Sequence, residues 1–309
     1  MTHNFRFSAS LGGMNGTDLV ANARRAEELG FSAVSLPDHF TDQAAPLIGL
    51  TAAAMATSTL RVLPLVLAND YREPLVLAKE LATLDALSGG RLDFGIGAGW
   101  MLTDYEEAGI TYDSAGTRIR RLRESVDILK ALLAGEQVHV DGEFYSIAAT
   151  LSAPLPVQPG GIPLMLAGGK QKMLTLAGEK ADIVGFNPGL TAGVIDERAG
   201  RTATAEKTDE KLTWIRDGAG QRFDDIELQT RIHVTMITDD REKVASELAP
   251  LLGVSPEEAL ESPHALVGTV AQCIEEAQRW RDRWGISFIS NNGTDMEDFA
   301  PVVEALAGR

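Results

Sequence analysis

The sequence predicts a (β/α)8 TIM barrel, an α/β fold, built as a single domain over residues 1–309. Strand-like apolar segments alternate with helix-like segments along the chain, which is the pattern of a parallel sheet covered by helices. Eight such strands can be counted. A length of 309 residues suits a barrel of this kind with insertions. No internal repeat or inter-domain linker interrupts the sequence.

The first half of the chain carries four predicted strands and three predicted helices. The strands are short apolar runs, and glycine or serine residues close two of the three helices. The expected strands are Phe5–Ser10, Phe31–Leu36, Arg61–Ala68 and Arg91–Ile96. The expected helices cover residues 17–29, 46–58 and 75–87. The helix at 46–58 is almost wholly apolar, whereas a barrel helix that faces solvent normally has a polar stripe. We therefore expect this helix to face a subunit partner.

The second half carries four more strands and two longer departures from the barrel pattern. The first is an insertion at about residues 100–162, with a helix at 118–133 and an alternating hairpin, GEQVHVDGEFYSI, around Asp141-Gly142. The second is a variable excursion at about 189–225, with a helix at 206–219. A further helix is expected at 173–180. The remaining expected strands are Leu164–Ala167, Ala181–Phe186, Ile226–Ile237 and Ile286–Ser290.

Composition excludes several classes of partner and site. Asp and Glu number 44 against 28 Lys and Arg, a net charge of −16, which argues against nucleic acid or an anionic membrane surface as a partner. The one cysteine, Cys273, excludes an internal disulfide and a multi-cysteine metal site, and we expect it to be a packed residue. No apolar run is long enough to span a bilayer, and the first residues lack the core of a signal peptide. We expect a cytoplasmic protein.

The segment from Tyr71 to Trp100 is the most informative part of the chain and reads YREPLVLAKELATLDALSGGRLDFGIGAGW. An apolar helix stops at Ser88-Gly89-Gly90, a short strand follows, and the strand opens into Gly97-Ala98-Gly99. Glycines let a flat ligand approach the backbone closely. Because ligands of parallel α/β barrels bind at the carboxyl ends of the strands, this pattern predicts a binding site near Gly97–Thr103.

These motifs resemble the luciferase-like monooxygenase family, and within it the branch that uses the deazaflavin coenzyme F420. The resemblance rests on YRxP, AKExATLDxLSGGR and GxGAGW in the same order, and extends to AEELGFSAVSLPDH and PLMLAGGKQKMLTLAGEKADIVGF. It implies an F420-dependent oxidoreductase that transfers a hydride to or from a small organic substrate, and it implies a homodimer. The weakest part of the resemblance is about residues 189–225.

The resemblance assigns chemistry to the loop after the second strand. It implies that His39 lies beside the deazaflavin ring, that Asp38 bonds near the pyrimidine portion of the ring, and that His39, Asp38 and Trp100 are the candidate catalytic residues. Histidine suits this position because its charge changes near neutral pH. From the residues alone, a loop histidine without a catalytic role is the alternative. Trp100 would supply a flat wall, its alternative being a buried loop anchor.

The third strand is expected to support the ring. Relatives have a bulge here with a non-prolyl cis peptide, and by position that bond would be Pro64–Leu65, with Leu65 behind the ring. Pro64 departs from the family pattern, since relatives have a small polar residue there. Asn69 follows at the mouth of the strand, either as a ligand or as a turn former. Relatives that oxidise sugar phosphates carry a carboxylate where Trp100 stands, so their substrate is not expected here.

Two further segments are predicted to bind the cofactor. Gly97, Ala98 and Gly99 would admit the ring, and Thr103 would donate or accept a hydrogen bond. After the fifth strand a helix begins at a glycine pair followed by lysine, and helix N-termini bind phosphate through free amides. This phosphate site would comprise Ala167, Gly168, Gly169, Lys170 and Gln171.

No metal site is predicted, because His139, His233 and His264 lack the spacing of metal ligands and read as structural. The nearest functional alternative is a monooxygenase that uses reduced FMN, since FMN and F420 share ring geometry and the barrel is the same. A non-redox barrel enzyme such as an aldolase would call for a Schiff-base lysine or metal-binding carboxylates at strand ends, which the predicted strand ends lack. A cofactor-binding paralogue without turnover is the third alternative.

Overall fold

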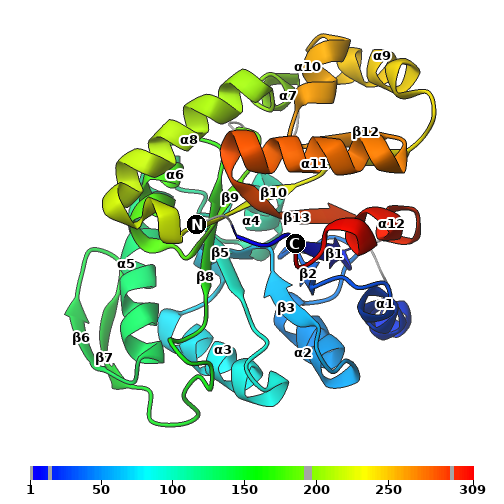
Figure 1. The fold of residues 1–309 in the computed structure, drawn as a ribbon. Coiled ribbons are helices and arrows are strands. Elements are labelled where there is room, and N and C mark those ends of the chain that lie inside the picture. Colours follow the sequence, from blue (N-terminus) through cyan, green and yellow to red (C-terminus); the bar gives the residue numbers. More distant parts are fainter. Residues whose placement is uncertain (1–2, 13–15, 191–196, 293–295) are drawn as a thin grey trace.

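The computed structural model describes residues 3–12, 16–190, 197–292 and 296–309. Over these residues one parallel sheet runs in the order β3-β2-β1-β13-β10-β9-β8-β5-β4 and curls into a barrel (Figure 1). Its strands are β1 (Arg6–Ser10), β2 (Ala33–Leu36), β3 (Arg61–Pro64), β4 (Leu67–Ala68), β5 (Phe94–Gly97), β8 (Leu164–Gly168), β9 (Ile183–Phe186), β10 (Glu227–Arg231) and β13 (Ile286–Asn292). The predicted barrel is confirmed, with β3 and β4 together forming its third strand.

The interruption of the third strand lies one residue later than the sequence indicated. The cis peptide joins Leu65 to Val66, so the prediction of a cis Pro64–Leu65 bond was wrong. Because the chain bulges there, β3 forms no regular ladder with β5, and an isolated parallel bridge joins Val62 of β3 to Leu92, just before β5. The Val62 amide donates to the Arg91 carbonyl at 2.9 Å, and the Asp93 amide donates to the Val62 carbonyl at 3.0 Å. These bonds close the barrel.

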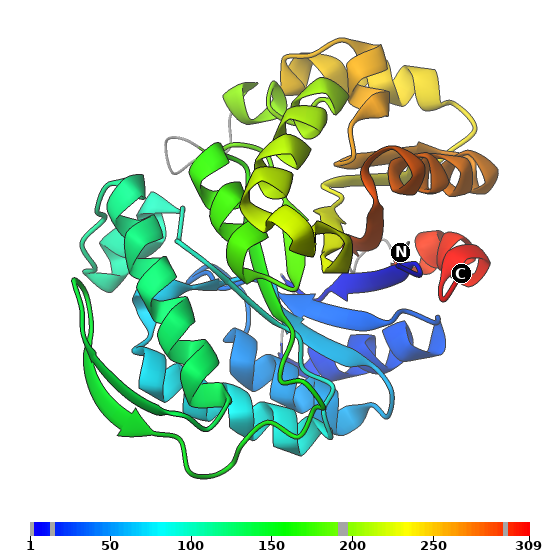
Figure 2. The same ribbon diagram turned by 60° about the vertical axis from the view of Figure 1, so that its left-hand side comes forward.

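Helices surround the barrel, and residues suited to helix ends mark where several of them begin or stop. Ser114 caps the helix that follows it, accepting from the Thr117 amide, and Gly89 ends another in the left-handed conformation. The outer layer is visible in Figures 1 and 2. It contains α1 (Gly16–Glu28), α2 (Pro46–Ala56), α3 (Pro74–Ser88), α5 (Ala115–Leu133), α6 (Gln171–Lys180), α8 (Ala205–Ala219), α11 (Val270–Trp284) and α12 (Met296–Leu306). No helix of the described residues is both long and apolar enough to cross a membrane.

The insertion before β8 has the predicted hairpin. It contains α4 (Leu102–Ala108) and the antiparallel pair β6 (Gln137–Asp141) and β7 (Ser146–Thr150), which lie along the outer side of α5 (Figure 1). Glu124 of α5 holds the hairpin turn by accepting from the Tyr145 amide at 2.9 Å. The helix predicted at 206–219 is α8 (Ala205–Ala219), which lies between β9 and β10, whereas residues 191–196 of the predicted excursion lie outside the described part.

The predicted seventh strand, Ile226–Ile237, was wrong, since two strands in different sheets occupy it. After β10 the Ile232 amide still bonds to the Ser290 carbonyl of β13, but the His233 amide bonds to the His264 carbonyl. The chain thus changes partners and continues as β11 (Val234–Ile237), which pairs in parallel with β12 (Ala265–Gly268). The accompanying helices, not predicted, are α7 (Glu197–Gly200), α9 (Arg241–Leu252) and α10 (Pro256–Glu261), and a 3-10 helix, η2 (Gly220–Asp225), precedes β10.

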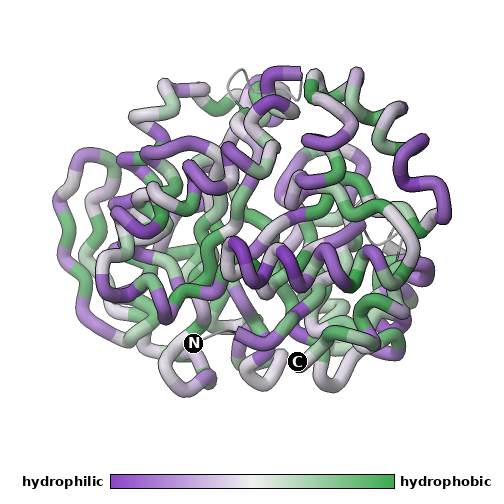
Figure 3. Tube along the Cα trace, turned by 45° about the horizontal axis from the view of Figure 1, so that its top comes forward, coloured by the Kyte–Doolittle hydropathy of each residue, from purple (hydrophilic) through white to green (hydrophobic). Residues whose placement is uncertain are grey.

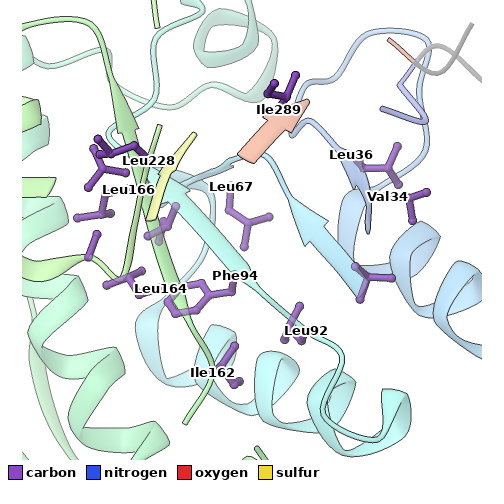
Figure 4. Packing of buried hydrophobic residues seen from close by; sticks show 14 of the residues in the cluster. Val34, Leu36, Leu67, Leu92, Phe94, Ile162, Leu164, Leu166, Leu228 and Ile289 are labelled. Atoms are coloured by element: carbon purple, nitrogen blue, oxygen red, sulfur yellow. The ribbon is translucent and has the colours of Figure 1, made fainter. Parts of the chain in front are cut away.

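Buried apolar side chains form two layers, one outside the barrel strands and one inside the barrel. The larger lies between strands and helices, where Leu164, Phe94 and Leu228 point outward from the strands (Figure 4). The smaller fills the barrel interior. Figure 3 shows hydrophobic residues along the inner strands and hydrophilic residues along the outer helices. The inner layer consists of Ala33, Leu63, Leu65, Met165, Ala167, Ile183 and Phe288, with Val66 packed against it.

The amino-terminal end of the barrel is closed by paired charges. Arg61 and Arg6 both bond to Asp93, at 2.5 and 3.2 Å, and Arg6 also pairs with Glu227 at 3.0 Å. Because each buried carboxylate here has a guanidinium partner, this end is electrostatically satisfied. Reacting groups are therefore expected at the opposite, carboxyl end.

The bulge of the third strand requires glycine on β5. A Cβ added at Gly95 would lie 2.4 Å from the Pro64 carbonyl oxygen and 2.7 Å from Val66 Cγ1. We expect Gly95→Ala to lower the free energy of unfolding by about 1–3 kcal/mol, as overpacking does. Urea denaturation of both proteins measures this.

Gly116 supplies the matched control. It lies in α5 with only the Ser114 Oγ atom near its added Cβ, at 3.9 Å. Gly116→Ala should leave stability unchanged or raise it by up to about 1 kcal/mol through helix propensity. Equal stability of Gly95→Ala and the wild type would contradict the packing argument.

Candidate active site

His39 lies where the chain leaves β2, at the carboxyl end of the barrel. Its Nδ1 atom is 2.7 Å from Asp104 Oδ2, and its ring meets Trp100 edge-on with centroids 5.5 Å apart. The His39 side chain is 20% exposed. The structure therefore brings the predicted residues His39 and Trp100 together, and adds Asp104, which sequence reasoning missed.

Asp104 is fixed as tightly as the histidine it contacts. It is buried at the start of α4, and it accepts hydrogen bonds from the Phe40 amide and the Tyr71 hydroxyl, both at 3.3 Å. Burial and the Asp104 charge raise the pKa of Tyr71, so Tyr71 remains a donor. A carboxylate on Nδ1 favours the tautomer with the proton on that nitrogen. The other nitrogen, Nε2, has no hydrogen-bond partner among the described residues and can exchange a proton.

Asp38 has protein partners for both carboxylate oxygens. Arg72 bonds to it through two nitrogens, at 2.6 and 3.1 Å, and the Ala68 amide donates to Oδ2 at 2.9 Å. These bonds tie the loop after β2 to β4 and so fix the position of His39. Contact between Asp38 and a cofactor ring stays a prediction, as does the catalytic role given to it.

Leu65 and Val66 form the wall beside this loop. Leu65 is buried in the inner layer and its amide bonds to the Leu36 carbonyl at 2.8 Å. Val66 presses toward β5, where an added Cβ at Gly97 would lie 3.0 Å from its Cγ2 atom. A side chain at position 97 would therefore press on Val66, independently of any ring. Pro64, also buried, ends β3, and the support of a ring by Pro64 and Leu65 stays a prediction.

Asn69 connects the mouth of the barrel to the inserted hairpin. It opens the short 3-10 helix η1 (Asn69–Tyr71), and its Nδ2 donates to the Tyr145 hydroxyl at 3.0 Å. Asn69 Oδ1 is buried and has no partner within the described part of the chain. An unsatisfied buried acceptor is costly, and a ligand N–H or O–H would satisfy it. No local sequence pattern indicates the contact with Tyr145, which lies 76 residues further along the chain.

The loop after β5 is rigid. Gly99 has a φ of +72°, and an added Cβ would lie 2.0 Å from the Tyr105 hydroxyl. The Ala98 carbonyl accepts from Arg118 Nε at 3.2 Å, and the Trp100 carbonyl from the Tyr112 hydroxyl at 2.8 Å. Trp100 is therefore held by its backbone while its ring faces His39. Thr103 lies exposed on α4, and its contact with a cofactor, like that of Gly97–Gly99, stays a prediction.

The loop after β8 offers free amides. Lys170 is the N-cap of α6, and no side chain caps this helix. Gly169 allows the loop after β9 to approach, because an added Cβ would lie 2.3 Å from the Pro188 carbonyl oxygen. Lys170 and Gln171 are exposed. Uncapped amides beside a lysine form an anion site of the predicted kind, and binding of a cofactor phosphate at 167–171 stays a prediction.

Two basic side chains near the mouth, one buried and one partly buried, were not predicted. Lys211 of α8 is 2% exposed and donates to the Asn187 and Thr202 carbonyls at 2.8 and 2.7 Å. Burial and the charge of Lys170 lower the pKa of Lys211 to about 7. Arg231, the last residue of β10, carries a buried Nε atom without a partner among the described residues. Sequence patterns did not single out either residue, because Lys211 lies within α8 and Arg231 within β10, where neither belongs to a recognisable motif.

Cys273 is a packed residue, as predicted. It is buried in α11, and burial raises the pKa of its thiol to about 11. Within the described ranges, no three His, Cys, Asp or Glu side chains are grouped so that they could hold a metal ion.

Comparisons with known proteins identify the family of this chain. A family model described as luciferase-like monooxygenase matches residues 2–282. The chain belongs to this family. Among its members, the 5,10-methylenetetrahydromethanopterin reductase of Archaeoglobus fulgidus is 35% identical over 170 residues, which cover 55% of this chain and 49% of the relative. The F420-dependent glucose-6-phosphate dehydrogenase of Amycolatopsis mediterranei is 32% identical over 173 residues, covering 53% of this chain and 51% of that one.

The matches to these two relatives thus span about half of each relative's length. A structural relative within the same fold is the coenzyme F420-dependent tetrahydromethanopterin reductase of Methanopyrus kandleri. It superposes with a TM-score of 0.79 over 99% of both chains at 19% identity. This likeness confirms the luciferase-like barrel.

We expect Asp104→Asn to free the His39 ring. An amide cannot hold the Nδ1 proton as a carboxylate does, so His39 should change from one tautomer to a mixture. Long-range ¹H–¹⁵N spectra of histidine-labelled protein measure this. The control is Asp127→Asn, an exposed α5 carboxylate paired with Lys180 at 2.7 Å, which should leave the His39 signals unchanged. A single, unaltered tautomer in Asp104→Asn would contradict the positioning role.

Proposed function

We propose that this protein is a coenzyme F420-dependent oxidoreductase that transfers a hydride between the deazaflavin and a small organic substrate. The observation that carries the proposal is His39, held through Nδ1 by the buried Asp104 at the barrel mouth, with Nε2 free. The related reductase from Methanopyrus kandleri and the related dehydrogenase from Amycolatopsis mediterranei, both named for F420, support this choice of cofactor.

The residues at the mouth fit F420. The unpartnered Asn69 Oδ1 accepts from an N–H or O–H donor such as those on the edge of a deazaflavin ring. The uncapped α6 N-terminus and Lys170 suit a phosphodiester. Leu65 offers an apolar surface to a flat ring. An acidic chain with a net charge of −16 needs such a local cation to hold an anionic cofactor.

When bound, F420 supplies the hydride chemistry, and the protein supplies position and proton transfer. His39 Nε2 takes a proton from the substrate as it is oxidised, or returns one as it is reduced. Asp104 stabilises the imidazolium that forms and keeps the ring in one orientation. Trp100, edge-on to His39, limits the access of water to Nε2. The geometry serves both directions of hydride transfer.

The alternative with the same barrel is a reduced-FMN monooxygenase. The two hypotheses differ in the number of basic side chains that the cofactor needs, because F420 carries a glutamate tail beyond its phosphate and FMN ends at the phosphate. A Schiff-base enzyme is less well supported, because the buried Lys211 already donates to two backbone carbonyls. A non-catalytic paralogue would have no use for the fixed His39–Asp104 pair.

The test is titration of the protein with F420 and, separately, with FMN, followed by ring and tryptophan fluorescence. We expect micromolar F420 binding with quenching of Trp100, and weaker FMN binding. Lys170→Gln should weaken F420 binding about tenfold, the loss expected for one charge-assisted contact. Lys172→Gln, an exposed neighbour on the same helix, is the control. Tight FMN binding alone would instead indicate the oxygen-using branch.

We also propose a homodimer through α2 and α3, in a cytoplasmic protein. Ile48 and Met55, two turns apart on α2, are 76% and 61% exposed, and Val76 on the neighbouring α3 is 54% exposed. Large apolar side chains gathered on adjacent helices are typical of a protein interface. The sequence of α2 lacks a polar stripe, and the exposed Ile48 and Met55 form the apolar surface that results.

Ile48→Glu should shift the protein from dimer to monomer, because it places a charge in the apolar contact. Light scattering coupled to size exclusion measures the mass. Thr213→Glu, on the exposed face of α8, is the control and should leave the mass unchanged. A wild-type protein that is monomeric at micromolar concentration would contradict the interface.

A further inference from the structure

Arg231 points into the mouth of the barrel. Side chains of a strand alternate between its two faces, so Arg231 shares the face of Gln229. Gln229 points inward, because its Nε2 donates to Ser290 Oγ at 2.9 Å and its Oε1 lies 2.8 Å from an added Cβ at Gly185. Arg231 is the last residue of β10 and therefore lies above Gln229, at the carboxyl end.

No carboxylate partners this guanidinium. Within the described part of the chain, Arg231 forms no ion pair and no side-chain hydrogen bond, and its Nε atom is buried. At the other end of the same inward face, Glu227 pairs with Arg6. Burial alone lowers the pKa of Arg231. Arg231 as a whole is partly buried, but a guanidinium nitrogen buried without an acceptor is costly, so its Nε is a donor that an oxygen of a ligand would satisfy.

The groups around Arg231 are neutral or cationic. The Arg231 carbonyl lies 3.0 Å from His264 Nδ1, which holds the backbone in place. Burial and the charge of Lys211 keep the pKa of His264 well below its ordinary value, so His264 is neutral. Lys211 in turn feels the charge of Lys170. Lys170 and Arg231, with Lys211 partly protonated near neutral pH, thus give this part of an acidic protein a positive local potential.

We propose that Arg231 binds the carboxylate or phosphate group of an anionic substrate. The planar fork of a guanidinium matches two oxygens of either group and discriminates against neutral ligands. This inference rests on the proposed function only in taking the bound anion to be a substrate. The anion site itself follows from a guanidinium that has no partner among the described residues.

The anion belongs to the substrate rather than to the cofactor for reasons of placement. The α6 N-terminus with Lys170 follows β8, and it already offers free amides to a cofactor phosphate. Arg231 follows β10, and β9 lies between β8 and β10 in the sheet. Arg231 is also the register partner of Ser290, whose hydroxyl bonds to Ser8 and Gln229 inside the barrel.

The first experiment titrates the cofactor-free protein with inorganic phosphate at constant ionic strength, by calorimetry. Arg231→Met should weaken phosphate binding at least about tenfold, the loss of a hydrogen bond to a charged group. Arg231→Lys, which keeps the charge but loses the fork, should fall between the two. Lys172→Gln removes an equal charge from an exposed site and should bind as the wild type does.

The variants are also expected to fold. Because Arg231 has no partner to lose, Arg231→Met should melt at or above the wild-type temperature without phosphate. If it fails to fold, Arg231→Lys decides the question. Phosphate binding by either folded variant with wild-type affinity would overturn the site.

The second experiment separates the two possible anions. Phosphate is titrated into the wild type saturated with F420, and then with the same deazaflavin lacking the phosphate and glutamate tail. Equal phosphate affinity in both supports the substrate assignment. Displacement of phosphate by F420 alone would overturn it in favour of the cofactor phosphate. A protein that binds phosphate through Arg231 but does not bind F420 would refute the proposed function and leave the anion site standing.

Discussion

The close approach of the interrupted third strand to β5 is the constraint on which the rest of the structure depends. Because the chain bulges at Leu65–Val66, the third strand meets its neighbour at Val62–Leu92 and again where β4 pairs with β5, and the bulge between them faces Gly95 of β5. The bulge also places the Ala68 amide within reach of Asp38. Asp38 then fixes the loop that carries His39, so the position of the candidate catalytic histidine follows from backbone packing on the neighbouring strand.

Charge is distributed unequally between the two ends of the barrel. At the amino-terminal end the carboxylates and guanidinium groups pair with one another, which serves stability. At the carboxyl end the carboxylates are all bound to groups that position the site, since Asp104 contacts His39 and Asp38 contacts Arg72. The Arg231 guanidinium is unpaired among the described residues. The end that is not satisfied by its own residues is the end that can bind a ligand.

The sequence pattern predicted those structural features that depend on residues close together in the chain. The barrel strands, the α8 helix and the hairpin around Asp141-Gly142 all follow from apolar periodicity and turn residues. The change of partner at Ile232–His233 could not be predicted, because the apolar run continues while the hydrogen bonds pass to His264. Asp104 was missed for a similar reason: its partner lies 65 residues earlier. The cis bond was misplaced by one residue because sequence alone does not fix the register of a bulge.

The hydrogen bond from Asn69 to Tyr145 makes the inserted hairpin part of the barrel mouth. The hairpin lies outside α5 and contributes no strand to the barrel, so its length and sequence can vary without disturbing the barrel's hydrogen bonds. A change of hairpin would release or redirect the Asn69 amide and so reshape the mouth from a distance. In evolutionary terms the insertion is an exchangeable module, through which one barrel can acquire new ligands while its folding core stays the same.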